Sequence, residues 1–231
     1  MYFFGMFDPV YWLFIGPTLA LTIWAQWRVK RAMGKWGRVP NLRGITGAEA
    51  AHAMLQKAGL SQVTVEQSKG FLSDHYDPRT RGIRLSERVY SGRSVAAIGI
   101  ACHEAGHAIQ HATHYAPLAL RNAIVPVASI GSRLAMPMIF LGLILHMQNL
   151  VLLGIAAFAI LVVFQLITLP AEFDASRRAK ETLRTMGLVQ TQGEGAGVAA
   201  VLDAAALTYV AATLSAIAQL AYFLLLSGRR R

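Results

Sequence analysis

His103-Glu104-Ala105-Gly106-His107 is the stretch around which the rest of this sequence is organised, and it has the form H-E-x-x-H. On an α-helix, residues four positions apart lie on one face, so both imidazoles can bind one zinc ion while Glu104 projects beside it. From there Glu104 can take a proton from a water molecule activated by the metal and pass it to the leaving amine of a peptide bond. The motif therefore predicts His103 and His107 as metal ligands and Glu104 as the catalytic general base.

The residues around the motif favour a helix with few polar neighbours. Ser94 is a good N-cap residue, and the run that follows it, Val-Ala-Ala-Ile-Gly-Ile-Ala-Cys, leads directly into the motif. Two histidines and a glutamate inside such a helix would lack polar partners unless they bound a cation. This context favours a metal site over a chance occurrence of the pattern. Cys102 is the only cysteine, and we expect it to be a small core residue.

Two histidines do not complete a catalytic zinc site, which needs a third protein ligand and an open position for water. One metal-peptidase pattern places a third histidine six residues after the second, but position 113 is Thr. His111 continues the same helical face. Three ligands at four-residue spacing on one straight helix span about 12 Å, however, which is too far for one ion. We expect His111 to solvate the helix end or to contact a ligand rather than the metal.

A glutamate delivered from a later helix is the other way to complete the site. Glu172 follows a long apolar run and stands at the start of a predicted charged helix. The alternative is that Glu172 is an ordinary acidic residue that complements a helix N-terminus. Position alone leaves both interpretations open.

Several segments together carry a resemblance to a known family. They are Asp74-His75-Tyr76-Asp77-Pro78, Leu85-Ser86, Tyr90-Ser91, the His103 motif with Gln110, Leu169-Pro170-Ala171-Glu172-Phe173-Asp174-Ala175-Ser176, and the Ala-Leu-Thr-Tyr-Val-Ala-Ala run at 206–212. The chain resembles the YugP-type neutral zinc metallopeptidases of bacterial membranes. The resemblance implies a zinc endopeptidase with one catalytic Zn²⁺ and with Glu172 as the third ligand.

A more distant similarity to the HtpX-type and CAAX-prenyl membrane peptidases concerns the residues after Glu172. Those peptidases pair the same metal helix with a later Glu-x-x-x-Asp. Here position 176 is Ser and the acid stands at Asp174, which we expect to contact a metal ligand rather than the metal.

The composition indicates a membrane protein. Apolar residues make up 55% of the chain, and the mean hydropathy is +0.43, which is high for a soluble domain. The net charge of +10 could suggest nucleic acid, but the basic residues stand beside apolar runs and no nucleic-acid-binding motif is present. We therefore expect contact with the lipid bilayer and with a peptide or protein substrate, including membrane proteins, and no nucleic acid.

The fold class expected is mainly α and integral to the membrane, with a gluzincin-like pair of metal helices, a small β-containing soluble insertion and about four membrane helices. We expect a membrane anchor at 1–27, a soluble catalytic part at 28–115, a transmembrane hairpin at 116–170, a helix with the third zinc ligand at 171–200, and a membrane helix with a basic tail at 201–231. Inside these segments, we expect the clearest membrane span at 150–169, a separate charged helix at 171–187 and a loop at 193–197.

The soluble insertion at 44–93 shows helix and strand signals. Thr46 followed by Glu49 predicts a capping box at the start of a helix that Gly59 ends. Residues 63–66 and 82–86 are typical of short strands. We expect the 82–86 strand to bind an extended substrate by strand addition, with His75 or Tyr76 near the cleft. The alternative is that residues 74–78 only shape a turn.

The distribution of charge predicts the orientation in a bacterial plasma membrane. Residues 28–43 contain six basic residues and no acidic one, so by the positive-inside rule they are cytoplasmic, together with the active site. Four crossings would then place the basic C-terminal tail outside, against the same rule, unless one apolar segment is interfacial.

Two other classes of protein remain open. One is a non-catalytic membrane scaffold or regulatory subunit whose structural zinc is closed by a fourth ligand, with His111 and Asp174 as candidates. The other is a transporter-like helical bundle, which the soluble segment and the small number of spans disfavour.

Overall fold

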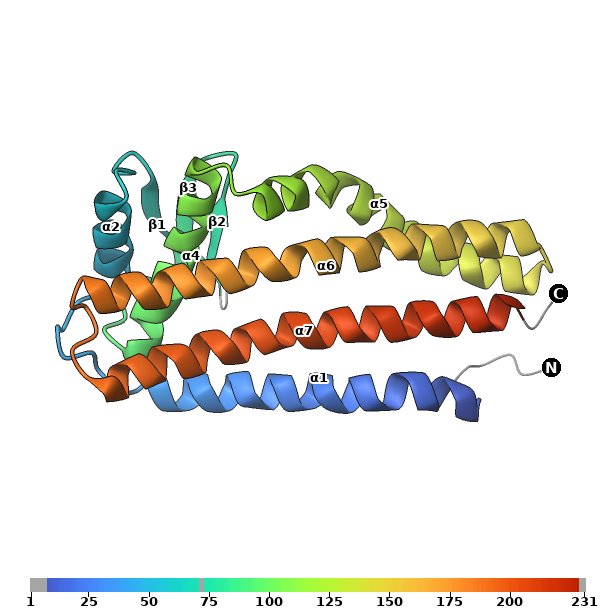
Figure 1. Cartoon of the computed structure of the whole chain (residues 1–231), viewed down its shortest axis with the longest axis horizontal. Coiled ribbons are helices and arrows are strands. Elements are labelled where there is room, and N and C mark those ends of the chain that lie inside the picture. Colours follow the sequence, from blue (N-terminus) through green and yellow to red (C-terminus); the bar gives the residue numbers. More distant parts are fainter. Residues whose placement is uncertain (1–7, 71–72, 229–231) are drawn as a thin grey trace. The chain divides into compact units, whose positions relative to one another are not determined.

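Helices dominate the computed structural model, which describes residues 8–70 and 73–228 (Figure 1). The predicted basic tail at 229–231 lies outside the described residues. The elements in chain order are α1 (Pro9–Trp36), α2 (Gly47–Lys57), β1 (Thr64–Ser68), β2 (His75–Asp77), β3 (Gly82–Ser86), α3 (Glu87–Tyr90), α4 (Val95–Ala112), α5 (Ala116–Ile144), α6 (Gln148–Thr185) and α7 (Gln192–Gly228).

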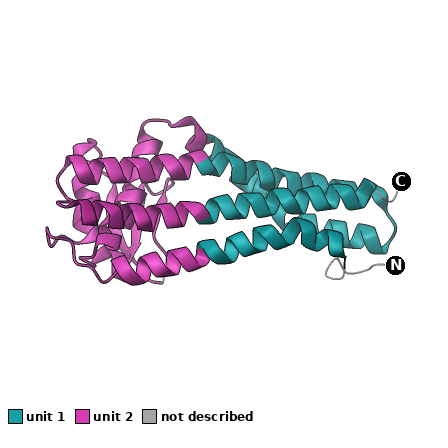
Figure 2. Ribbon diagram, turned by 60° about the horizontal axis from the view of Figure 1, so that its bottom comes forward, with its two compact units in different colours: residues 1–25, 120–169, 208–231 teal, residues 26–119, 170–207 magenta. Residues whose placement is uncertain are grey.

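The chain divides into two compact units, which Figure 2 distinguishes by colour. Unit 1 contains residues 1–25, 120–169 and 208–231, and unit 2 contains residues 26–119 and 170–207. Unit 2 is thus built from two stretches of sequence that the α5–α6 hairpin separates. The H-E-x-x-H motif lies in the first stretch and Glu172 in the second.

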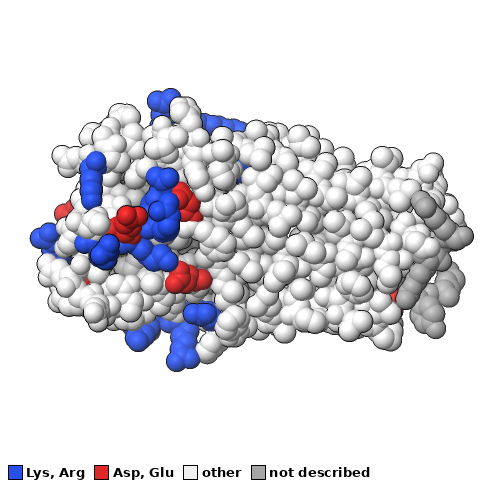
Figure 3. Space-filling model, viewed as in Figure 1, with Lys and Arg blue, Asp and Glu red and all other residues white. Residues whose placement is uncertain are grey.

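Unit 1 consists of the apolar parts of four helices. Its small core contains Tyr222 and Phe223 of α7 with Ile139, Val151 and Ile155 of α5 and α6. Many of its large apolar side chains are exposed, and the face seen in Figure 3 carries almost no charge on this unit. Such a surface suits a lipid environment.

Three described helices are long and apolar enough to cross a membrane, namely α5, α6 and α7. The sequence predicted about four spans, and α1 is not among these three. Aromatic and polar residues such as Trp24, Gln26 and Trp27 dilute the apolar character of α1.

Unit 2 packs a helical layer against a small sheet. The capping box predicted for α2 is confirmed: the Thr46 side chain accepts from the Glu49 N–H, and the Glu49 carboxylate accepts from the Thr46 N–H. Gly59 ends this helix with a φ of 72°, as predicted. Ser94 caps α4 by accepting from Ala97 N. The core of the unit includes the side chains of Met54, Ile83, Leu85, Ile98 and Cys102.

The sheet has the order β1-β3-β2, with β3 parallel to β1 and antiparallel to β2. The prediction that the 82–86 strand binds substrate by strand addition is therefore wrong, because β3 is the central strand and both of its edges are already paired. Strand β2 was not predicted as a strand. It forms one edge of the sheet and contains His75 and Tyr76.

Two predicted helix boundaries are also wrong. Helix α6 runs without interruption through Pro170, whereas a separate charged helix was predicted at 171–187. A proline removes one backbone hydrogen bond, but here both sides of α6 are packed within their own units.

The predicted loop at 193–197 is the first part of α7. The Glu194 N–H donates to the Thr191 hydroxyl, and a Cβ on Gly197 would lie 2.5 Å from the Trp36 ring. The glycine permits close helix packing rather than a loop.

Candidate metal centre

Helix α4 presents the H-E-x-x-H residues from a rigid, buried element. His107 is 6% exposed and Glu104 is 8% exposed. The two imidazole rings lie 4.8 Å apart between centroids, in an edge-to-face arrangement. The four-residue spacing thus places both rings on one face of the helix, as the sequence predicted.

Glu172 reaches the two histidines from α6, and a glycine permits the approach. A Cβ on Gly106 would lie 2.8 Å from the carbonyl oxygen of Ala175 and 3.1 Å from its Cα. Any larger residue at position 106 would therefore push α6 away from α4. Gly106, the second x of H-E-x-x-H, consequently sets the distance between α4 and α6.

The distances from Glu172 to the two histidines fit a zinc ion. His103 Nε2 lies 3.3 Å and His107 Nε2 lies 3.6 Å from Glu172 Oε2. Zinc binds nitrogen and carboxylate oxygen at about 2.0–2.2 Å, so two ligands at corners of a tetrahedron lie roughly 3.3–3.6 Å apart. These are long separations for a direct hydrogen bond. Among the described residues, these three form the group able to hold a metal.

The charges at the centre also suit a cation. Burial alone would raise the pKa of the Glu172 carboxyl, but the neighbouring imidazoles of His103 and His107 outweigh this effect and lower it. Burial lowers the pKa of His107, but the neighbouring carboxylates of Glu172 and Glu104 raise it by more, so the net shift is upward. Glu172 therefore remains ionised, which is the form that binds a metal.

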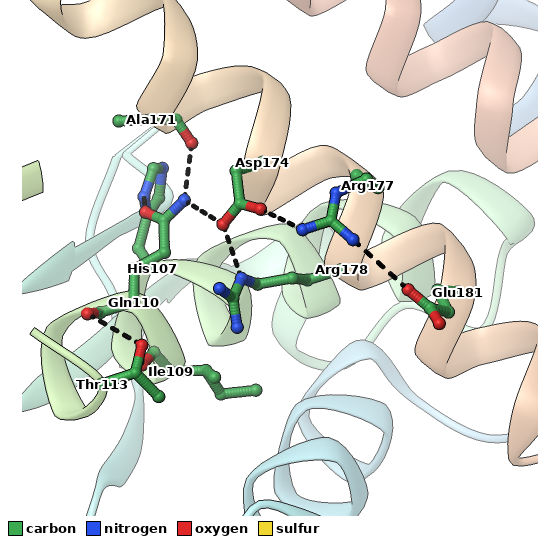
Figure 4. Close-up of polar contacts among 9 residues, drawn as sticks. All are labelled: His107, Ile109, Gln110, Thr113, Ala171, Asp174, Arg177, Arg178 and Glu181. Carbon is green, nitrogen blue, oxygen red and sulfur yellow. Dashed lines mark hydrogen bonds and ion pairs between the residues drawn. The ribbon is translucent and has the colours of Figure 1, made fainter. Parts of the chain in front are cut away.

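Gln110 fixes the orientation of His107, as Figure 4 shows. Its side chain is fully buried. The amide nitrogen donates to the Ala171 carbonyl at 2.7 Å and to Asp174 Oδ2 at 2.9 Å. Because both partners can only accept, the amide oxygen must face His107 Nδ1, 2.9 Å away. His107 Nδ1 then carries the proton, and Nε2 is left free to bind a metal.

The sequence predicted that Asp174 contacts a metal ligand directly. In the structure the Gln110 side chain lies between Asp174 and His107. Its carboxylate accepts from Gln110, Arg177 and Arg178, and no hydrogen bond to either histidine is found among the described residues. Burial raises the pKa of Asp174, but the hydrogen bonds from Arg178, Gln110 and Arg177 lower it overall. Asp174 thus holds Gln110 in place rather than contacting a ligand.

His103 has a different partner. The Ser176 hydroxyl lies 3.1 Å from His103 Nδ1. Ser176 stands one helical turn after Glu172 on α6, so a single face of that helix supplies both a ligand and a partner for a second ligand. Sequence reasoning missed the contacts of Gln110 and Ser176 with the two histidines. The available signals were the three-residue spacing of Gln110 from His107 and the four-residue spacing of Ser176 from Glu172.

Glu104 faces the edge of the sheet. Its Oε2 accepts from the Tyr76 backbone N–H at 3.0 Å. The Tyr76 hydroxyl lies 2.8 Å from His111 Nδ1, so the structure brings His111 to β2 and not to the metal ligands. His75 is exposed, and its Nδ1 lies 2.7 Å from the Ser73 carbonyl.

Comparisons with known proteins identify the family of this chain. A family described as "Putative neutral zinc metallopeptidase" matches residues 11–228. The chain belongs to this family. It is 48% identical over 223 residues to "Putative membrane protease YugP" of Bacillus subtilis (strain 168), covering 94% of this chain and 98% of that protein. No solved structure matches the chain significantly.

Membership of the neutral zinc metallopeptidase family implies zinc, and the ligand chemistry found here fits it. Two imidazole nitrogens and one carboxylate oxygen form a donor set found in catalytic zinc sites. The matched region includes all three residues.

Proposed function

We propose that this chain is a membrane-embedded zinc endopeptidase of the gluzincin type. The observation that carries the proposal is the meeting of His103, His107 and Glu172, with both histidine nitrogens at ligand spacing from the Glu172 carboxylate and with Glu104 adjacent on α4. A zinc ion held by these three residues would act as a Lewis acid toward a water molecule and toward the carbonyl oxygen of the substrate.

The residues of the chain then have separate tasks. Glu104 accepts the proton of the attacking water and delivers it to the amine nitrogen as the C–N bond breaks, so no acyl-enzyme forms. Gln110 holds His107 in the tautomer with a free Nε2. Glu104 is held near the site by the Tyr76 N–H until substrate arrives.

The free edge of β2 is the place where we expect substrate to bind. Along an edge strand, alternate residues point their backbone groups outward. The Tyr76 N–H points to Glu104, so an extended peptide paired to this edge would lie beside the general base. This assigns substrate binding to Tyr76 and the β2 edge, with His75 at its start.

A structural zinc in a scaffold protein is the alternative, and it would need a fourth protein ligand. The candidates were His111 and Asp174. His111 is engaged with Tyr76, and Asp174 is engaged with Gln110 and two arginines. Among the described residues no fourth donor joins the group, which favours a site open to water.

We also propose that α1 crosses the membrane and that the active site faces the cytoplasm. Residues 28–43 are basic without an acidic residue, and such segments stay inside. The α5–α6 hairpin crosses and returns, which keeps both sequence stretches of unit 2 on one side. The membrane association itself is consistent with the three apolar helices and with the name of the Bacillus relative.

Cleavage of unfolded casein by the detergent-purified protein tests the function, with zinc quantified in each sample. Wild type should cleave and bind about one zinc. Glu104→Gln should keep zinc and lose cleavage, and His107→Ala should lose both. His52→Ala serves as the control, because His52 is an exposed histidine on α2. Cleavage by Glu104→Gln at the wild-type rate would refute the proposed base, and zinc without cleavage in wild type would favour the scaffold.

A further inference from the structure

A large cavity lies within unit 2, and none of the three metal ligands lines it. Its volume is about 1150 Å³. Its walls come from the end of α1 and the residues after it, the end of β1, the β3–α3 junction and the first turns of α4. Most of the lining is apolar, and includes Val29, Met33, Val89, Ala96 and Ile100.

The polar part of the lining is strongly basic. Lys30, Arg38, Lys69, Arg88 and Arg93 line the cavity, against two acidic residues. Because a cluster of cations with few anions repels itself, it favours an anionic occupant.

The two acidic residues, Asp74 and Glu87, are outnumbered by the five basic residues of the lining. Asp74 accepts hydrogen bonds from the Ser86 N–H and hydroxyl. Within 8–70 and 73–228, no ion pair or hydrogen bond is found for the side chains of Lys30, Arg38 or Lys69. Three cations therefore remain available to a ligand.

The α1 wall of the cavity has the character of a membrane interface. Trp27 is 51% exposed, and the Arg31 guanidinium stacks on its ring at 5.1 Å from the centroid. Exposed tryptophan next to basic residues, at the end of an apolar run, is typical of the head-group region of a bilayer. Among the cations of the cavity, Lys30 stands about one helical turn after Trp27 on α1.

We propose that this cavity binds the head group of an anionic phospholipid. Lys30, Arg38 and Lys69 would contact the phosphate, while Val29, Met33 and Ile100 would contact the glycerol and the first methylene groups. A mixed lining of this kind matches an amphiphile better than a free phosphate ion, which would leave the apolar walls uncovered. Ile100 precedes His103 by one helical turn, so the lipid would lie close to the start of the metal helix.

The test measures lipid binding by the full-length protein, with native mass spectrometry after release from detergent micelles. The probes are dioctanoyl phosphatidylglycerol and dioctanoyl phosphatidylcholine. The variant is Lys30→Gln with Arg38→Gln, and the matched control is Arg31→Gln with Lys35→Gln. All four side chains are exposed and belong to the same basic segment, but the control pair does not line the cavity.

Wild type should bind phosphatidylglycerol more tightly than phosphatidylcholine. The Lys30/Arg38 double variant should lose about thirtyfold in affinity for phosphatidylglycerol, and the control pair less than about threefold. Equal losses in both pairs would overturn the proposal in favour of diffuse surface charge. Equal affinities for phosphatidylglycerol and phosphatidylcholine would show that the cavity binds lipid through its apolar walls alone, and would overturn the proposal of an anionic head-group site.

Two competitors distinguish other occupants. Displacement of phosphatidylglycerol by inorganic phosphate at a similar concentration would identify a phosphate site and overturn the lipid assignment. Displacement by an acidic peptide from the Glu104→Gln protein would identify a substrate site instead. Neither result depends on peptidase activity, so failure of this proposal and failure of the proposed function are distinguishable.

Discussion

Replacing Gln110 by Met should weaken zinc binding without removing a ligand. The two side chains have similar volume, so the change deletes polar contacts and leaves no large cavity. The lost contacts are the bond to His107 Nδ1 at 2.9 Å and the bonds to Ala171 and Asp174. Without a fixed acceptor at Nδ1, His107 can adopt the tautomer that protonates Nε2, which cannot bind a metal.

The size of the effect follows from the role of Gln110 behind the ligand. Loss of such partners costs about 10–100-fold in metal affinity, or roughly 1.4–2.7 kcal/mol. Gln110 is fully buried, and the substitution also removes the side-chain donor to the Ala171 carbonyl, so we expect the upper part of that range. Asp174 retains its two arginines, which limits the cost to the fold.

The assay is competition between metal-free protein and a chromophoric zinc chelator, in detergent at neutral pH. Gln56→Met is the matched control, because Gln56 is exposed on α2. Helical circular dichroism in the metal-free state separates a folding defect from a binding defect. A zinc affinity for Gln110→Met within about twofold of wild type would refute the tautomer argument, as would an equal loss in the control.

Three further predictions concern other parts of unit 2. Gly106→Ala should separate α4 from α6, since its Cβ would meet the Ala175 backbone, and zinc stoichiometry should fall; Gly34→Ala, whose Cβ meets open space, should not change it. Burial raises the pKa of Cys102 to about 12, so alkylation of the folded protein should stay slow and should not accelerate between about pH 7 and 9, as it would for a free thiol; rapid labelling before unfolding would contradict this. Removing zinc with a chelator should lower the unfolding midpoint, since an ion at about 100 times its Kd adds about 2.7 kcal/mol; an unchanged midpoint would exclude tight binding.

Local features of unit 2 could be predicted because their causes are local. The Thr46–Glu49 capping box, the Ser94 cap and the spacing of His103 and His107 each involve residues within one helical turn. Sequence reasoning identifies such patterns because both partners are visible in one short window.

Other features depend on partners far away along the chain. Gly197 looked like part of a loop because Trp36, on which it packs, is remote in sequence. Strand β2 is three residues long and is defined by its pairing with β3, which residues 74–78 alone do not reveal. Glu172 could be preferred over an ordinary acidic residue only through the resemblance to a family, because its partners are two histidines on another helix.

The division of unit 2 into two stretches of sequence has a consequence for biosynthesis. The last ligand emerges from the ribosome about 65 residues after His107, which takes roughly 3–13 s at 5–20 residues per second. Within that interval the α5–α6 hairpin, residues 120–169 of unit 1, is synthesised. A nascent chain therefore holds only two of its three ligands until the hairpin is complete. The metal centre can therefore assemble only after the hairpin has been synthesised. A chain truncated before Glu172 would be released without a complete metal centre.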